Sequence, residues 1–185
     1  MVRILVIGPT SLGWDEIADA VTADLQRLAR PGVVLEYRCT GTGPTGIQSA
    51  DDAAAAAPGV VETARRGAAD GFDAVIVDCT DDPGVDRADT ELDIPVVGPG
   101  AALRAAAARA PSPVVWLSGD ELRASTFEQL VERLDVAATV VLGGTGWSDT
   151  ADRLRDEYPD LVVLDPLPVA LDHCLARLGH DASGR

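Results

Sequence analysis

Short, mostly apolar runs alternate along the chain with longer segments in which apolar residues recur every three or four positions. The runs occupy residues 2–8, 33–38, 72–79, 94–98, 112–119, 138–144 and 161–166. Continuous apolar runs are typical of parallel strands that are covered on both faces, whereas the spacing within Ser11–Arg30 is helical. The pattern therefore predicts an α/β fold with a mainly parallel sheet.

Composition and charge exclude several classes of protein. No apolar run approaches the ~20 residues of a membrane span, and no basic, signal-like segment precedes the first run. We therefore expect a cytoplasmic protein with no membrane partner. The formal charge of −15 is unfavourable for binding nucleic acid.

The side-chain inventory restricts the possible cofactors. All 15 basic residues are arginine, which excludes a lysine Schiff base and a Walker A loop. Three widely spaced cysteines argue against a disulfide framework and against a CxxC zinc site. "GTGPTG" (41–46) matches G-x-G-x-x-G, but it follows the second strand, and Pro44 lacks an N–H for a pyrophosphate. We expect neither a cofactor nor a metal.

"DAVIVDCTDDPG" (73–84) brings a cysteine to the carboxyl end of a predicted strand, where ligands bind in parallel sheets. Asp82 and Pro83 form a favourable start for a following helix, as its N-cap and first residue. A helix N-terminus would lower the pKa of Cys79, whereas neighbouring carboxylates would raise it. The sequence leaves this balance open.

The segments "DAVIVDCTDD" and "ATVVLGGTGW" resemble each other, with Cys79 opposite Gly144 and Thr80 opposite Thr145. Two similar lobes facing each other would bring these strand ends to one cleft. The alternative is that any two buried strand–helix units look alike at this level.

Several segments together resemble the aspartate/glutamate/hydantoin racemase superfamily, especially its hydantoin and allantoin racemase branch. They are "RILVIGPTS", "GPTGIQSADDAAAAAPGVVE", "GFDAVIVDCTDDPG", "IPVVGPG", "TVVLGGTG" and "LVVLDP". The resemblance implies two pseudo-symmetric lobes with mainly parallel sheets, the first formed by 1–98 and 166–180 and the second by 99–165. It also implies cofactor-independent chemistry, in which one cysteine from each lobe flanks the acidic carbon of the substrate.

The chain departs from this family in three places. The position of the second cysteine falls on Gly144, which has no proton to exchange. Gly8-Pro9-Thr10 stands where the branch tends to have Asn-Pro-Asn. The segment between "VVWLSG" and "TVVLGG" is short, so we expect a truncated second lobe.

These comparisons define a candidate site with Cys79 as its catalytic residue. Backbone N–H groups and hydroxyls near it would hold the oxygen of an enolate. The predicted substrate-binding residues are Pro9, Thr10, Ser11, Pro44, Ile47, Thr80, Asp81, Ser118, Gly143, Gly144 and Thr145.

Two classes of function remain open. The first is a one-thiol enzyme acting on a small molecule at a carbon next to a carbonyl or carboxylate, as an isomerase, an epimerase or a decarboxylase-like enzyme. Alternatively, Cys79 attacks a thioester or a related biosynthetic intermediate and leads to acyl transfer or cyclisation. The second class is a racemase-derived module that binds a small molecule or a partner without turnover. In either class we expect a homo-oligomer, because a reduced lobe needs a neighbour to cover its core.

Overall fold

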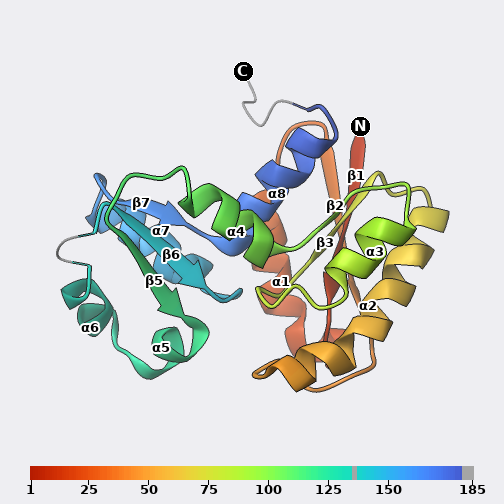
Figure 1. Ribbon diagram of the computed structural model, residues 1–185, viewed down its shortest axis with the longest axis horizontal. Coiled ribbons are helices and arrows are strands. Elements are labelled where there is room, and N and C mark those ends of the chain that lie inside the picture. Colours follow the sequence, from red (N-terminus) through yellow and green to blue (C-terminus); the bar gives the residue numbers. More distant parts are fainter. Residues whose placement is uncertain (135–136, 181–185) are drawn as a thin grey trace.

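Two parallel sheets organise the chain in the computed structural model, which describes residues 1–134 and 137–180 (Figure 1). The first sheet has the order β2-β1-β3-β4, and the second has the order β5-β6-β7. Every strand pair is parallel. The strands are β1 (Val2–Gly8), β2 (Val33–Cys39), β3 (Ala74–Val77), β4 (Val96–Val97), β5 (Val114–Ser118), β6 (Thr139–Gly143) and β7 (Val162–Leu164). The predicted α/β class is confirmed.

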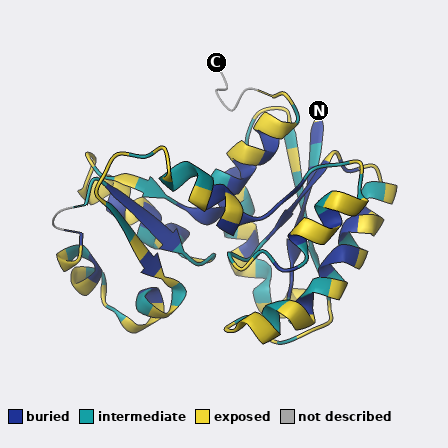
Figure 2. Ribbon diagram, viewed as in Figure 1, coloured by how far each residue is buried: buried dark blue, intermediate teal, exposed yellow. Residues whose placement is uncertain are grey.

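Helices connect successive strands and cover the sheets. They are α1 (Trp14–Leu28), α2 (Ala50–Ala69), α3 (Val85–Glu91), α4 (Pro99–Ala107), α5 (Gly119–Ala124), α6 (Phe127–Glu132), α7 (Ser148–Glu157) and α8 (Pro166–Arg177). Among the described residues, no helix combines the length and the apolar character that crossing a membrane requires. Figure 2 shows the sheets largely buried and the outer faces of the helices exposed.

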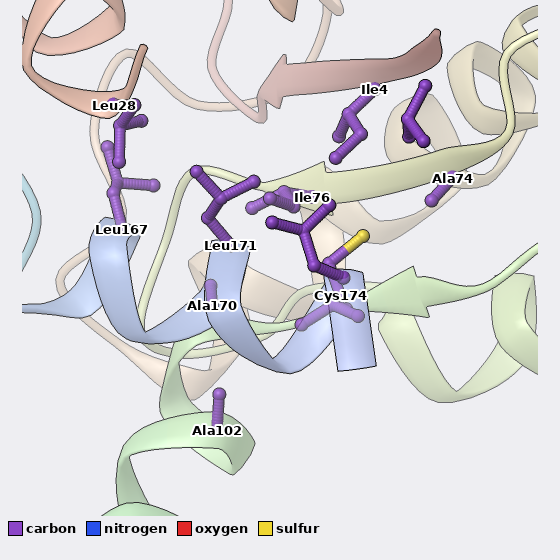
Figure 3. Packing of buried hydrophobic residues seen from close by; sticks show 12 residues of the cluster. Ile4, Leu28, Ala74, Ile76, Ala102, Leu167, Ala170, Leu171 and Cys174 are labelled. Carbon is purple, nitrogen blue, oxygen red and sulfur yellow. The ribbon is translucent and has the colours of Figure 1, made fainter. Parts of the chain in front are cut away.

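The first sheet is buried on both faces, which explains the continuous apolar runs of its strands. Ile4 and Ile76 point to one face, where Leu171 of α8 packs against them (Figure 3). Leu5 and Val75 point to the other face, which α2 and α3 cover. Because successive strand residues alternate between faces, the central strands β1 and β3 are apolar at nearly every position, whereas the edge strand β2 is only partly buried and includes Glu36 and Arg38.

Helix α8 follows the second sheet in sequence but packs on the first. Its Cys174 is fully buried in the core beside Ile76, so this thiol is a packing group (Figure 3). α8 also lies against α4, and these two helices run between the sheets (Figure 1). The lobe boundaries at 98 and 165 and the truncation of the second lobe stay predictions.

α2 runs unbroken from Ala50 to Ala69 with Pro58 inside it. A proline in a helix removes one hydrogen bond and costs about 3 kcal/mol. Apolar contacts on both sides of Pro58, from Ala56, Val60 and Ala64, bury the helix against the sheet and offset this cost.

Candidate functional site

The Cys79 thiol lies just beyond the carboxyl end of β3 and is partly buried. A turn follows it at once, in which the N–H of Asp82 donates to the Cys79 carbonyl at 3.1 Å. This turn directs the chain away from the sheet and keeps the thiol at its edge. The sequence located the cysteine correctly at a strand end.

The surroundings of Cys79 keep its thiol protonated. Burial raises the pKa of Cys79 to about 12, and the charges of Asp81, Asp78 and Asp82 add to the rise, while the backbone N–H of Asp81 opposes it. The Cys79 Sγ lies 3.8 Å from Asp81 Oδ2 as a hydrogen-bond donor. At pH 7 a thiol with this pKa is a thiolate in only about one molecule in 10⁵. The balance that the sequence left open is therefore decided in favour of the neutral thiol.

Asp82 caps a different helix from the one its sequence context suggests. α3 begins at Val85 after Gly84, whose φ is 72°, so Asp82 is not its N-cap and Pro83 is not its first residue. Instead Asp82 accepts hydrogen bonds from two N–H groups in the first turn of α4, those of Gly100 at 2.8 Å and Ala101 at 2.7 Å. The prediction was wrong because Asp82 has a φ of 51°, unlike the extended backbone of an N-cap, and both of its carboxylate oxygens accept N–H groups of α4.

A cleft of 310 Å³ lies where the carboxyl ends of the two sheets meet. The hydroxyl of Thr80 donates to the carbonyl of Gly143 at 3.2 Å and so joins the Cys79 turn to the end of β6. The lining residues are Ile47, Gln48, Cys79, Thr80, Asp81, Ser118, Gly119, Asp120, Arg123, Gly143, Gly144 and Thr145. Cys79 and Gly144 thus share one cavity, as the internal similarity implied.

Pro9, Thr10, Ser11 and Pro44 were predicted at the site but do not line this cleft. Their two loops lie together, because the Ser11 N–H donates to the Pro44 carbonyl at 2.9 Å. The Thr40 hydroxyl also donates to the Thr10 carbonyl at 3.0 Å. Substrate binding by these four residues, and by the predicted residues inside the cleft, stays a prediction.

The cleft contains charged groups that the sequence analysis missed. Arg123 is the one cation among its described lining residues, and it pairs with Asp120 at 2.6 Å. Both come from α5, which starts with a capping box between Ser118 and Glu121. The S-x-x-E spacing is a sequence signature of a helix N-terminus. Recognising it would have predicted that Arg123 lies one helical turn from the cleft.

A buried carboxyl behind the cleft was also missed. Asp78 precedes Cys79, and its Oδ2 accepts a hydrogen bond from the Tyr37 hydroxyl at 3.0 Å. Burial raises the pKa of Asp78, whereas the Tyr37 and Thr145 hydroxyls lower it. Asp78 Oδ1 is buried, and no described residue lies in hydrogen-bonding geometry to it, although Thr145 is close enough to affect its pKa. A Cβ on Gly8 would overlap the Tyr37 hydroxyl, so a larger residue there would have to displace Tyr37 from its hydrogen bond to Asp78.

Neither of two other places in the structure rivals this cleft. A hollow of 720 Å³ lies between the end of α6 and the loop from α7 to β7, but its described lining residues include neither a cysteine nor a cation. Among residues 1–134 and 137–180, no three histidine, cysteine or acidic side chains are grouped as metal ligands. The thiol-bearing cleft therefore remains the candidate site.

Solved structures of other proteins align with nearly the whole of this chain and have the same fold. An allantoin racemase from Klebsiella pneumoniae is 24% identical with a TM-score of 0.81, and the match covers 99% of this chain and 91% of that one. A glycine-to-cysteine, cysteine-to-serine double mutant of arylmalonate decarboxylase is 14% identical with a TM-score of 0.67, covering 100% and 96%. These similarities show the fold.

Sequence comparison identifies the family. A hydantoin racemase from Pseudomonas sp. (strain NS671) is 41% identical over 56 residues, a segment that spans 30% of this chain and only 22% of that enzyme. The sequence profile described as Asp/Glu/Hydantoin racemase matches residues 4–119, which include β1 to β5 and the Cys79 turn. With more than half of its length matched, the chain belongs to the Asp/Glu/hydantoin racemase family.

Proposed function

We propose that this protein is a cofactor-independent, one-thiol enzyme that transfers a proton at a carbon next to a carbonyl or carboxylate. The observation that carries the proposal is the cleft itself, in which Cys79 and Gly144 lie at the carboxyl ends of the two sheets. Of the three cysteines in the chain, Cys39 is not among the lining residues and Cys174 is buried in the core. A proton therefore reaches the substrate from one side only.

The protonated state of Cys79 indicates the direction of the transfer. With a pKa of about 12, the resting thiol is an acid, so it donates its proton to a carbanion or enolate. The S–H bond breaks, a C–H bond forms, and the sulfur keeps the electron pair as a thiolate. Hydrogen-bond donors at the cleft, such as the Thr145 hydroxyl and the backbone of Gly143 and Gly144, would hold the enolate oxygen.

The arylmalonate decarboxylase neighbour supports a one-thiol arrangement. Its double mutant exchanges a glycine for cysteine and a cysteine for serine, so the parent enzyme has one glycine and one cysteine at these two positions. This chain likewise combines one cysteine with one glycine, but in the reverse order, because Cys79 precedes Gly144 whereas the glycine comes first in the decarboxylase. Loss of carbon dioxide would generate the carbanion that a neutral thiol then protonates, which makes decarboxylation the favoured reaction.

Nucleophilic acyl transfer is less favoured because it requires a thiolate, and burial and three nearby carboxylates oppose ionisation of Cys79. A binding module without turnover remains the contrasting class. A homo-oligomeric state and a cytoplasmic location stay predictions as well.

The test is to incubate the protein with phenylmalonate, benzylhydantoin and allantoin in deuterium oxide and to follow the carbon next to the carbonyl by proton NMR. The wild type should incorporate deuterium there or release carbon dioxide, Cys79→Ser should do neither, and Cys39→Ser should behave as the wild type. A wild type that binds these compounds but exchanges no proton would refute the enzyme and support the binding module.

A further inference from the structure

The Cys79 thiol is closely associated with one residue, Asp81. Asp81 Oδ2 lies 3.8 Å from Sγ and accepts its hydrogen, while the Asp81 backbone N–H lowers the Cys79 pKa. The Cys79 residue is only partly exposed, whereas Asp81 is exposed and also lines a second cavity of 310 Å³ beside the cleft. The carboxylate therefore connects the sulfur to water.

A single-thiol site has a requirement that a two-thiol site does not have. With two thiols, one removes a proton and the other returns one. When Cys79 alone donates its proton to carbon, it is left as a thiolate, and the next turnover needs a new proton from water. That proton has to reach a sulfur that is largely covered.

We propose that the Asp81 carboxyl carries the proton between water and Cys79 Sγ, an inference that rests on the proposed one-thiol function. Asp81 takes a proton at Oδ2 from hydronium or a buffer acid in the solvent, which leaves water or the buffer base. The Oδ2–H bond then breaks, the thiolate lone pair forms the S–H bond, and the carboxylate is regenerated. A thiolate beside a carboxylate is electrostatically unfavourable, so the transfer to sulfur is downhill.

Other carboxylates near the thiol are bound to other groups. Asp78 Oδ2 accepts from Tyr37, and both oxygens of Asp82 accept N–H groups of α4. Asp120 lines the same cleft but pairs with Arg123 and is not among the charges that shift the Cys79 pKa. Of these groups, Asp81 alone combines a hydrogen bond to Sγ with exposure to water.

The first experiment measures iodoacetamide alkylation of Cys79 against pH, mapped by peptide mass, and requires no substrate. Asp81→Asn removes the charge beside the sulfur, so the apparent pKa should fall and alkylation at a fixed lower pH should become about tenfold faster. Asp120→Asn removes the same charge from the same cleft and should leave the alkylation profile unchanged. The proposal is overturned if the pH profile of Asp81→Asn coincides with that of the wild type. It is also overturned if Asp120→Asn shifts the profile by the same amount as Asp81→Asn.

The second experiment tests proton delivery during turnover of phenylmalonate. Asp81→Ala should lower kcat with little change in KM, and added acetate should restore kcat because a small carboxylic acid can occupy the vacated space. Wild-type kcat in Asp81→Ala, or a loss that acetate does not rescue, overturns the role. If the wild type itself shows no turnover, the proposed function fails, and the alkylation profile alone decides whether Asp81 is coupled to Cys79.

Discussion

A second thiol placed at Gly144 should convert one-sided proton transfer into racemisation. A Cβ at this position would meet Gly119 Cα at 3.5 Å and two ring atoms of Trp147 at 3.5 and 3.6 Å, which are ordinary van der Waals contacts. Gly144 is also absent from the glycines with positive φ. The backbone and the space around it therefore accept Gly144→Cys.

The structure sets the expected size of the effect on stability and on rate. Replacing a glycine in an unstrained conformation changes the free energy of unfolding by about 1 kcal/mol or less, with a stabilising sign. A correctly placed acid–base group accelerates proton transfer about 10²–10⁴-fold. Gly144→Cys should therefore fold normally, and its exchange of the substrate's α-proton should increase within that range.

The assay follows loss of optical activity of an enantiopure benzylhydantoin, with reductant present, together with deuterium uptake. Gly144→Ser is the control for side-chain volume without the thiol, and the Cys79→Ser, Gly144→Cys double variant should be inactive as a racemase. If folded Gly144→Cys exchanges the substrate's α-proton no faster than Gly144→Ser, then Cys79 and residue 144 do not face opposite sides of the substrate carbon, and the reasoning is refuted. Gly143→Cys should instead unfold more easily, because its Cβ would lie 2.7 Å from the Leu117 carbonyl.

Further predictions concern the thiol and two buried aspartates. Cys79→Ser should lose turnover while its melting temperature stays near that of the wild type, as calorimetry would show. Asp82→Ala leaves the N–H groups of Gly100 and Ala101 without their acceptor, so urea unfolding should show a loss of about 1–2 kcal/mol. Burial raises the pKa of Asp165 from 3.8 to about 6, and the stability that comes from its protonated form is fully present below pH 3.8 and lost as pH rises through 6. At pH 7.5 Asp165→Asn should therefore raise the free energy of unfolding by up to about 3 kcal/mol over the wild type, and at pH 3.5 by little. Equal increases at both pH values, measured by urea unfolding, would contradict the raised pKa of Asp165.

The sequence by itself determined the class of fold, the family and the position of the thiol. Each apolar run that predicted a parallel strand forms one, and in the central strands β1, β3 and β6 nearly every position is buried. Cys79 was placed at a strand end because "VIVDC" ends an apolar run. Local periodicity is sufficient for features of this kind.

Only the tertiary structure decided how the thiol is surrounded and which residues share its cleft. The Tyr37–Asp78 and Thr80–Gly143 hydrogen bonds join residues 41 and 63 positions apart, and the α4 cap at Asp82 joins residues 18 and 19 apart. No helical or strand period encodes such contacts. The neutral state of Cys79 follows mainly from burial, which depends on how distant segments approach each other, whereas the carboxylates that add to it are its neighbours in sequence. The sequence therefore identified the candidate thiol, whereas its protonation state and its partners came from tertiary packing.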